Sequence, residues 1–415
     1  MNVLVVNAGS SSLKYQLFDT TTETVYAKGI CERIGIEGSL IEHKKADGTK
    51  VKKVTPMPDH SVATEIVVSM LTDAENGCIK SMDEIEAVGH RVVHGGPYFF
   101  ESTVVTPEVV KIIDECSEFA PLHNPAHIMG IKGCTKVMPN TPQVVVFDTA
   151  FHQTMPAKAY TYPLPIKMVE EDHIRRYGMH GTSHRFVATE AMKILNKEDS
   201  KIITCHIGNG SSISAVRDGK VLDTSMGFTP LDGVEMGTRC GAIDPAIVPY
   251  IMQKYDIPVE KISDFLNKKC GFLGVSGYSS DSRDIEAAIL GKFDESLPTC
   301  PKTEEEKAAV QKHALLAAEI LAYQVKKYIG SYSAAMNGLD CVVFTAGVGE
   351  NDARLRALAL ENMDYYGIKI DPEKNNTRGC VDITAADSKV KVLVIPTNEE
   401  LMIARDTEAC VNKAK

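Results

Sequence analysis

A strand-and-turn pattern occurs twice in this chain and constrains its fold more than any other feature. Residues 3–19 contain an apolar strand, a turn rich in Gly and Ser, and a second strand-like segment. Residues 202–222 repeat this order and add a hairpin signal at Asp218-Gly219. A repeat separated by about two hundred residues predicts two domains of one plan, with their turns facing each other across a cleft. Only a handful of positions match, so coincidence is the alternative.

The first of these turns has the composition of a phosphate-binding loop. It consists of residues 7–12, which include Asn7 and three serines, and it is followed by Lys14. Small residues let backbone N–H groups approach a ligand, while the amide, the hydroxyls and the ammonium add polar groups and positive charge. The turn therefore indicates a site for a phosphate and its metal ion, and an ordinary polar hairpin is the alternative.

The length and charge of the chain narrow the class of protein. A chain of 415 residues is too long for one compact core, and we expect an N-terminal domain at 1–150 plus 397–415 and a C-terminal domain at 151–396. Its 45 basic and 55 acidic side chains give a net charge of −10, which argues against a nucleic-acid surface.

The apolar runs are too short for a membrane span and no signal-peptide pattern is visible, so a cytoplasmic location is expected. Eleven cysteines without a Cys-x-x-Cys pair favour reduced thiols over disulfides or a structural zinc site.

Four further apolar runs are predicted to be buried strands, and each ends in polar residues or glycine. They cover residues 88–93, 144–147, 341–345 and 390–395. Ligands of doubly wound sheets lie outside the carboxyl ends of the strands, so Asp148, residues 347–351 and residues 397–400 are expected site elements. Residues 347–351 lack the third glycine of a dinucleotide fingerprint and suit a mononucleotide instead. A helix is expected after Thr303, where Glu306 completes a capping box.

Two arginines stand among glycines, where packing rarely requires an arginine. Arg91 precedes the pair Gly95-Gly96, and Arg239 lies between Gly237 and Gly241. A guanidinium binds carboxylate or phosphoryl oxygens with two parallel hydrogen bonds, and a structural salt bridge is the alternative for each arginine. Asp148 is expected to orient an arginine or a metal-bound water, or else to cap a helix.

Three His-x-x-x-His pairs require zinc to be considered. The pairs are His90/His94, His123/His127 and His180/His184. The metalloprotease form needs a glutamate directly after the first histidine and a helix beneath both, and none of the three pairs has that glutamate. We therefore favour histidines that donate hydrogen bonds to phosphate oxygens, with a zinc hydrolase as the alternative.

Nine segments in order resemble the acetokinase family of the acetate and sugar kinase, Hsp70 and actin superfamily, over nearly the whole chain. The segments are residues 5–14, 89–96, 120–125, 147–152, 180–184, 206–212, 236–239, 344–347 and 397–400. The resemblance implies an α/β fold of two actin-like, ribonuclease H-like domains with a duplicated βββαβαβα plan and an active-site cleft between them. It also implies reversible in-line transfer of a phosphoryl group from ATP to acetate, giving acetyl phosphate and ADP, with propionate as the alternative acid. Mg²⁺, or Mn²⁺ in its place, and a homodimer are implied as well.

The resemblance also assigns a role to each matching residue. The catalytic residues would be Arg91, His123, Asp148, His180 and Arg239. The nucleotide would be bound by Ser10, Ser12, Lys14, His206, Asn209, Gly210, Asp281, Ser282, Arg283, Gly347, Val348, Gly349, Glu350 and Asn351. The acyl group would contact Arg91, Val93, Leu122, Met179 and Pro230, and the metal ion would be held by Asn7 and Glu399.

Two residues depart from the family pattern. Met179 stands where phenylalanine is usual, and its more pliable side chain predicts an altered preference among acetate, propionate and butyrate. Ala242 stands where Asp or Asn is usual, which predicts a lost local hydrogen bond with activity retained. A non-enzymatic ATP switch of the actin or Hsp70 kind has the same fold, but it would not need the two arginines together with His123 and His180.

Overall fold

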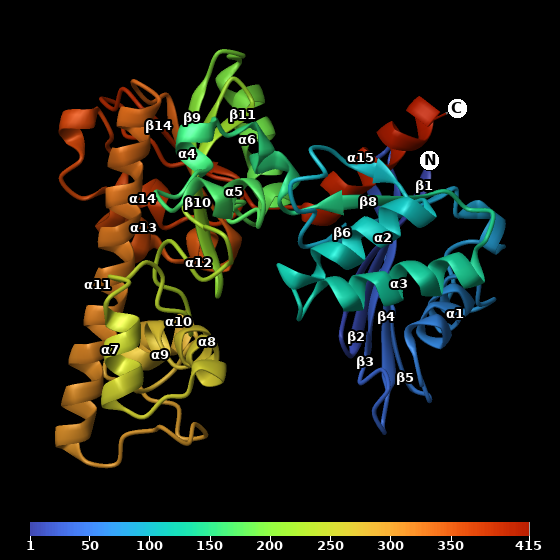
Figure 1. The fold of residues 1–415 in the computed structure, drawn as a ribbon, viewed down its shortest axis with the longest axis horizontal. Helices are drawn as coiled ribbons and strands as arrows, with labels where there is room; N and C mark the ends of the chain where they lie inside the picture. The colour runs from blue at the N-terminus through green and yellow to red at the C-terminus, as the bar shows by residue number, and fades with distance from the viewer. Residues whose placement is uncertain (415) are drawn as a thin grey trace. The chain divides into compact units, whose positions relative to one another are not determined.

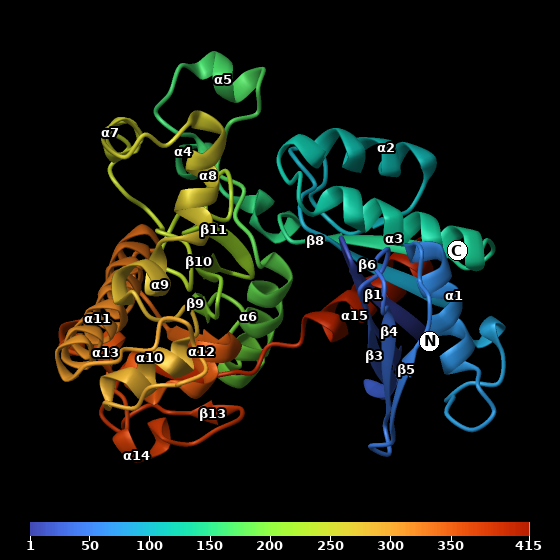
Figure 2. The same ribbon diagram turned by 90° about the horizontal axis from the view of Figure 1, so that it is seen from below.

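The computed structural model describes residues 1–414, and Lys415, the end of the expected segment 397–415, lies outside them. The described chain forms two compact units, whose elements are labelled in Figures 1 and 2. Unit 1 holds Met1–Gln153, Gly181–Ser183 and the described residues from Asn398 on. Unit 2 holds Thr154–His180 and His184–Thr397.

Unit 1 is built on one eight-stranded sheet in the order β5-β4-β3-β2-β1-β6-β8-β7. Its strands are β1 (Asn2–Gly9), β2 (Ser12–Asp19), β3 (Thr24–Glu32), β4 (Leu40–Lys45), β5 (Lys50–Val54), β6 (Ala87–Val92), β7 (Thr103–Val104) and β8 (Gln143–Phe147). β1 pairs antiparallel with β2 and parallel with β6, and β6 pairs parallel with β8. The carboxyl ends of β1, β6 and β8 therefore lie at one edge of the sheet.

Helices cover both faces of this sheet. They are α1 (His60–Leu71), α2 (Pro107–Glu115), α3 (Asn124–Val137) and α15 (Glu399–Ala414), with the 3-10 turns η1 (Met82–Glu84), η2 (Cys116–Glu118) and η3 (Ala150–Thr154). Leu4, Val6 and Val88 share a core with α1 and α3, whereas Gly89 faces Ile403 of α15. Because successive residues of a strand point to opposite faces, α15 lies on the face opposite α1 and α3 (Figure 2).

Unit 2 is built on a six-stranded sheet in the order β11-β10-β9-β12-β14-β13. Its strands are β9 (Lys201–Ile207), β10 (Ser211–Arg217), β11 (Lys220–Thr224), β12 (Cys341–Thr345), β13 (Val381–Asp382) and β14 (Lys391–Val394). Its helices are α4 (Ala157–Tyr160), α5 (Ile166–Glu170), α6 (Gly181–Leu195, whose first three residues belong to unit 1), α7 (Ile247–Lys254), α8 (Val259–Lys268), α9 (Gly271–Ser276), α10 (Ser282–Ile289), α11 (Glu304–Ala335), α12 (Ala346–Asn351), α13 (Ala353–Leu360) and α14 (Pro372–Asn375), with the turn η4 (Asp364–Tyr366). Helices α11 and α13 share one apolar core with this sheet.

The predicted duplication of one plan is confirmed by the two sheets. Each sheet places three antiparallel strands beside two parallel strands and ends in a two-residue antiparallel strand, as β3-β2-β1-β6-β8-β7 and as β11-β10-β9-β12-β14-β13. Asp218 and Gly219 both have positive φ, 53° and 72°, as a two-residue hairpin turn between twisted strands requires. The predicted α/β class and repeated strand order therefore match the structure.

Two local expectations are corrected. β1 continues through Gly9, so the predicted turn 7–12 shrinks to two residues, and Asn7 pairs with Lys14 across the hairpin. Strand pairing prevails because it satisfies backbone N–H and C=O groups that an open turn would leave to water. Residues 347–351 form helix α12 instead of an open glycine turn, because intrahelical hydrogen bonds satisfy the same groups.

The longest helix and the cysteines follow the predictions. α11 begins directly after Thr303, whose hydroxyl accepts the Glu306 N–H while the Glu306 carboxylate accepts the Thr303 N–H. All eleven cysteines are free thiols. Among the described residues, no helix combines the length and the hydropathy that crossing a bilayer requires.

The contact between β6 and α15 depends on Gly89 having no side chain. A Cβ at Gly89 would lie 2.8 Å from Ile403 Cγ2 and would overlap Thr407 Oγ1, and both partners are fully buried. We expect Gly89→Val to lower the free energy of unfolding by about 1–3 kcal/mol, because α15 must move off the sheet. Thermal unfolding measures this loss. Gly330→Ala, where an added Cβ makes only ordinary contacts, is the control, and equal melting temperatures for the two variants would contradict the prediction.

Candidate functional site

The parallel strands β6 and β8 bring Arg91 and Asp148 together in unit 1. Arg91 lies opposite Val146 in the ladder, and Asp148 follows the last residue of β8. Arg91 Nη2 donates to Asp148 Oδ2 at 2.6 Å, and Arg91 Nε donates to Oδ1 at 3.3 Å. Asp148 is only 1% exposed, and a buried carboxylate is costly unless it is paired and hydrogen-bonded, as it is here by Arg91. Asp148 therefore orients an arginine, which is one of the roles expected from the sequence.

Glu399, the first residue of α15, lies close enough to this ion pair to interact with both partners electrostatically. Burial and, secondarily, the negative charge of Asp148 raise the pKa of Glu399 to about 7, while Arg91 opposes the shift. Two carboxyl groups thus lie near one guanidinium in a buried place. Such a group of oxygen ligands fits a small divalent cation.

The β1–β2 hairpin contributes the remaining predicted residues of unit 1. Asn7 and Lys14 line a cavity of about 550 Å³ together with Glu400, the neighbour of Glu399. Ser10 is exposed at the turn and Ser12 is half-buried. The Asn7 amide adds a neutral oxygen to the acidic groups, and Mg²⁺ accepts few protein ligands because it keeps several waters. Within residues 1–414, no three His, Cys, Asp or Glu side chains are grouped so that they could hold a metal ion.

In unit 2, hydrogen bonds to hydroxyl groups orient the rings of the third histidine pair, His180 and His184. His180 Nδ1 lies 2.8 Å and His184 Nε2 lies 2.7 Å from the hydroxyl of Ser212, and His184 Nδ1 lies 2.7 Å from Thr204 Oγ1. His180 also stacks on His206 with 4.0 Å between ring centroids. His180 has a φ of 58°, an uncommon conformation for a residue with a side chain, and it precedes α6. The predicted residues His180 and His206 are therefore neighbours, and their rings are held in fixed orientations.

Arg239 and the Gly210 turn lie beside His180. A Cβ built at Gly210 would lie 3.5 Å from Arg239 Nη1 and 3.6 Å from His180 Nε2. Arg239 Nη1 donates to the Pro230 carbonyl over 3.4 Å and approaches Met236 Sδ at 3.7 Å. Burial lowers the pKa of Arg239, and no carboxylate of the described residues offsets this effect. The guanidinium is thus a half-buried cation with weak neutral partners, which is available to an anion.

A second cavity, of about 690 Å³ and in unit 2, is lined by seven of the fourteen predicted nucleotide residues. They are Asn209, Asp281, Ser282, Arg283, Gly347, Val348 and Asn351. A Cβ at Gly347 would meet no atom within 4 Å, so the backbone there is open to a ligand. Gly349 and Glu350 do not line the cavity, because the Gly349 carbonyl accepts from Arg356 and the Glu350 carboxylate faces Thr345.

The residues predicted for an acyl group differ in exposure. Val93 and Met179 are buried, at 6% and 3% exposure, and Pro230 is half-buried. Leu122 is 74% exposed, and His123 beside it precedes α3 on the surface of unit 1. At the second departure from the family pattern, the exposed Ala242 donates its N–H to the Gly233 carbonyl at 2.8 Å.

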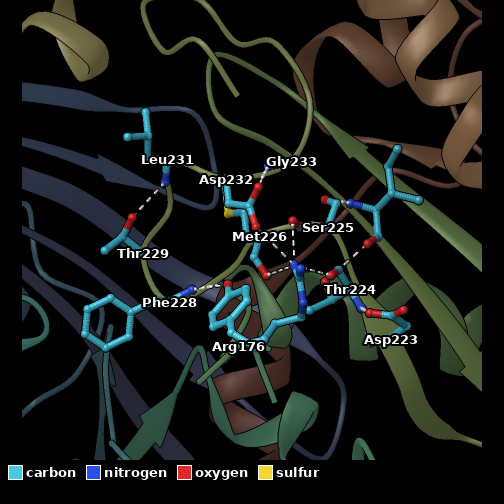
Figure 3. Close-up of polar contacts among 12 residues, drawn as sticks. Arg176, Asp223, Thr224, Ser225, Met226, Phe228, Thr229, Leu231, Asp232 and Gly233 are labelled. Atoms are coloured by element: carbon cyan, nitrogen blue, oxygen red, sulfur yellow. Dashed lines mark hydrogen bonds and ion pairs between the residues drawn. The ribbon is translucent and has the colours of Figure 1, made fainter. Parts of the chain in front are cut away.

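Arg176 is a structural residue of this region that the sequence did not reveal. Its Nη1 donates to the carbonyls of Thr224, Ser225 and Met226 at 2.9, 2.9 and 3.1 Å and lies 3.4 Å from Asp232 Oδ2 (Figure 3). The Tyr177 and Gly178 N–H groups donate to the Gly227 carbonyl, so the segment before His180 is hydrogen-bonded to the same loop. This loop, residues 224–233, carries Pro230, which in turn contacts Arg239.

One aromatic and one basic residue of the second cavity were also not predicted from the sequence. Phe272 and Arg378 line it, although neither lies in a recognisable motif. No motif marks them, since Phe272 lies about sixty residues after Asn209 and nine before Asp281, and Arg378 lies about thirty residues after Asn351. Arg378 adds a positive charge to a cavity whose Arg283 is already paired with Asp281 at 2.6 Å.

Known proteins resemble this chain over its whole length. The sequence profile of the Acetokinase family matches residues 2–405. The chain is 56% identical to the acetate kinases of Methanosarcina acetivorans, covering 100% of this chain and 98% of that protein, and of Methanosarcina thermophila, covering 99% and 97%. Among solved structures, an acetate kinase of Porphyromonas gingivalis matches with a TM-score of 0.91 at 45% identity, covering 99% of each chain. A propionate kinase from Francisella tularensis matches with a TM-score of 0.86 at 39% identity, covering 98% of this chain and 99% of that one.

Replacing Arg176 should destabilise unit 2. In Arg176→Met the carbonyls of three successive residues lose their donor and Asp232 loses its cation, so we expect the free energy of unfolding to fall by about 2–4 kcal/mol. Chemical denaturation measures the change. Arg217→Met is the control, because the exposed Arg217 pairs only with its neighbour Asp218 and such a pair contributes about 0–1 kcal/mol. Equal losses in the two variants would refute the role of Arg176.

Proposed function

Because this chain belongs to the acetokinase family, we propose that it catalyses reversible phosphoryl transfer between ATP and acetate, giving acetyl phosphate and ADP. The observation that supports this most directly is the half-buried Arg239 guanidinium, which has no carboxylate partner within residues 1–414 and lies beside His180 and the Gly210 turn. Such a group binds an anionic ligand with two hydrogen bonds. A phosphoryl group or a carboxylate meets that requirement.

The chemistry of the reaction explains the kind of residues that unit 1 and unit 2 provide. Acetate is ionised at neutral pH, so the attacking carboxylate needs no general base. Catalysis then depends on alignment of the reacting groups and on cations that neutralise charge as the phosphoryl group moves. Arg91 keeps three of its five N–H groups after the two that Asp148 accepts, and these can bind a carboxylate or phosphoryl oxygen. His180 would donate to the phosphoryl oxygens, and His123 is proposed for the same role.

We propose that Glu399 and Asn7 hold Mg²⁺, with Mn²⁺ as a substitute. The two buried carboxyl groups of Asp148 and Glu399 fit this cation, and the Asn7 amide adds a neutral ligand. Bound Mg²⁺ would neutralise phosphate oxygens of the nucleotide. Ser10, Ser12 and Lys14 would bind the same phosphates from the β1–β2 hairpin.

The cavity of about 690 Å³ in unit 2 is proposed for the nucleotide. Asn209 and Gly210 would bind phosphates, and residues 281–283 with Gly347, Val348 and Asn351 would cover the adenosine. His206, Gly349 and Glu350 would act from the rim of this site. Open backbone at Gly347 supports the assignment, because a side chain there would occupy space that the cavity leaves free.

Several expectations from the sequence and from the resemblance stay proposals. They are the domain limits 1–150 with 397–415 and 151–396, the homodimer, the cytoplasmic location, and the placing of the acyl group against Val93, Leu122, Met179 and Pro230. The propionate kinase of Francisella tularensis makes propionate the second candidate acid, and the Met179 side chain is the feature of this chain that favours it.

Formation of ADP with and without acetate tests the proposed reaction. We expect ADP to form only with acetate present, and we expect Arg91→Ala and Arg239→Ala each to lower kcat by about 100-fold or more while the nucleotide KM changes little. The reason is that both guanidinium groups would act mainly in the transition state. A coupled assay for ADP measures both parameters.

Two outcomes would contradict this assignment. Turnover of ATP that does not depend on acetate would favour an ATP switch of the actin or Hsp70 kind. Wild-type kcat in both arginine variants would remove the arginines from the mechanism. Arg217→Ala is the matched control, because Arg217 is exposed and contacts only Asp218 among charged groups.

The choice of acid should depend on Met179. Phenylalanine is larger and stiffer than methionine, so Met179→Phe is expected to lower kcat/KM for propionate and butyrate relative to acetate by about tenfold. Assays with the three acids measure the ratio. Ala242→Asp, the other departure from the family pattern, is exposed and should leave the ratio unchanged. An unchanged ratio in Met179→Phe would show that this side chain does not contact the acyl group.

A further inference from the structure

Two thiols lie against each other beside Arg239. Cys240 follows Arg239, and Cys270 precedes α9. The Cys270 Sγ donates to Phe265 O at 3.5 Å, beside the Leu266 carbonyl that accepts from Cys240 N, and each thiol shifts the pKa of the other. The backbones of the two segments are joined by hydrogen bonds from Cys240 N to Leu266 O at 3.2 Å and from Cys270 N to Thr238 O at 3.0 Å. Both side chains are half-buried, so a small solute reaches them. Within unit 2 these residues form a pair of nucleophiles that the proposed reaction does not use.

The segment that carries Cys270 packs directly against the backbone of Arg239. Gly271 has a φ of 61°, and a Cβ there would lie 2.8 Å from Arg239 O and 3.0 Å from Arg239 N and would overlap Met236 O. The chain after Cys270 thus touches the backbone of Arg239 directly. Because the guanidinium itself has only a 3.4 Å hydrogen bond and a sulfur contact, small shifts of this backbone change where it points.

We propose that Cys240 and Cys270 form a reversible disulfide that displaces Arg239 and switches the enzyme off under peroxide. This inference rests on the proposed role of Arg239 in phosphoryl transfer. A disulfide fixes the two sulfur atoms about 2.05 Å apart, much closer than two thiols in van der Waals contact. The segment 238–240 must therefore move toward Cys270, and misplacement by about 1 Å is enough to impair a positioned catalytic group.

The pKa shifts of the two thiols indicate the order of the steps. The interaction with Cys240 lowers the pKa of Cys270, whereas the interaction with Cys270, together with burial, raises the pKa of Cys240. The Cys270 thiolate is therefore the one that attacks hydrogen peroxide. It forms an S–O bond as the O–O bond breaks, which gives a sulfenic acid and hydroxide, and hydroxide takes up a proton.

The second step closes the disulfide. The Cys240 sulfur loses its proton and attacks the Cys270 sulfur, so an S–S bond forms, the S–O bond breaks and water leaves. In total, two thiols give up two electrons and two protons, and one peroxide is reduced to two molecules of water. A small dithiol reverses the reaction by exchange, becoming a disulfide itself.

Tryptic digestion of the whole protein tests the proposal. The protein is first treated with hydrogen peroxide, and the thiols that remain free are then blocked before trypsin is added. Trypsin cleaves after Arg239, Lys254, Lys269 and Arg283, so Cys240 and Cys270 fall in separate peptides with one cysteine each. After treatment with hydrogen peroxide we expect these two peptides to appear linked, two hydrogen atoms lighter than their sum. We expect kcat for ADP formation to fall about tenfold or more with formation of the link, and dithiothreitol to restore both.

Two variants separate this thiol pair from other cysteines. Cys270→Ser keeps a small hydrogen-bonding side chain, retains activity in the reduced state and should resist peroxide, whereas Cys380→Ser removes an exposed thiol and should remain sensitive. The proposal is overturned if the linked peptide does not form, if it forms without loss of kcat, or if Cys270→Ser is inactivated as fast as the wild type. If the reduced wild type shows no acetate-dependent ADP formation, the proposed function fails, while the linked peptide still reports on the thiols by itself.

Discussion

The ion pair between Arg91 and Asp148 is the interaction on which the chemistry proposed for unit 1 depends. Asp148 is almost completely buried, and a buried carboxylate is stable only with a cation and hydrogen bonds around it. Two parallel strands meet this requirement because β6 and β8 end side by side and Arg91 reaches Asp148 through two of its nitrogens. Glu399 lies in the same buried place, and burial, together with the nearby Asp148 carboxylate, raises its pKa, which explains why a metal ion suits it.

The two arginines of the proposed mechanism are held in different ways. Arg91 has a carboxylate partner that fixes its orientation, so its position is rigid and part of its charge is compensated. Arg239 has a carbonyl and a sulfur as neighbours, so its charge is uncompensated and its orientation is easily changed. A rigid arginine suits a group that must align a substrate, whereas a loosely held arginine suits a group whose partner changes during the reaction. The loop tied down by Arg176 limits how far the second arginine can move.

Much of the fold and part of the site could be predicted because strands leave a local trace. Apolar runs ending in polar residues identified β6, β8, β12 and β14, and the residues after them include Asp148. The turn 7–12 was predicted too long because glycine and serine favour turns locally, while pairing with the neighbouring strand decides the outcome. Residues 347–351 were misread for the same reason, since their helix depends on the packed structure around it.

Arg176 shows why the other residues of the site could not be predicted from the sequence. Its partners are main-chain carbonyls about fifty residues away, and a carbonyl is the same in every residue, so no side-chain pattern marks the contact. Phe272 and Arg378 reach their cavity from segments whose neighbourhood only the fold creates. The roles proposed for these residues therefore follow from three-dimensional contacts and not from motifs.

The hydroxyl of Ser212 has one proton and two imidazole neighbours, His180 and His184. It can donate to only one of them at a time and must accept from the other. When both rings are neutral, rotation of this single O–H therefore decides which nitrogen of His180 carries hydrogen, and so whether Nε2 faces its surroundings as a donor or as an acceptor. A side chain with no proposed contact to the substrate thereby sets the polarity of one that is proposed to make such a contact.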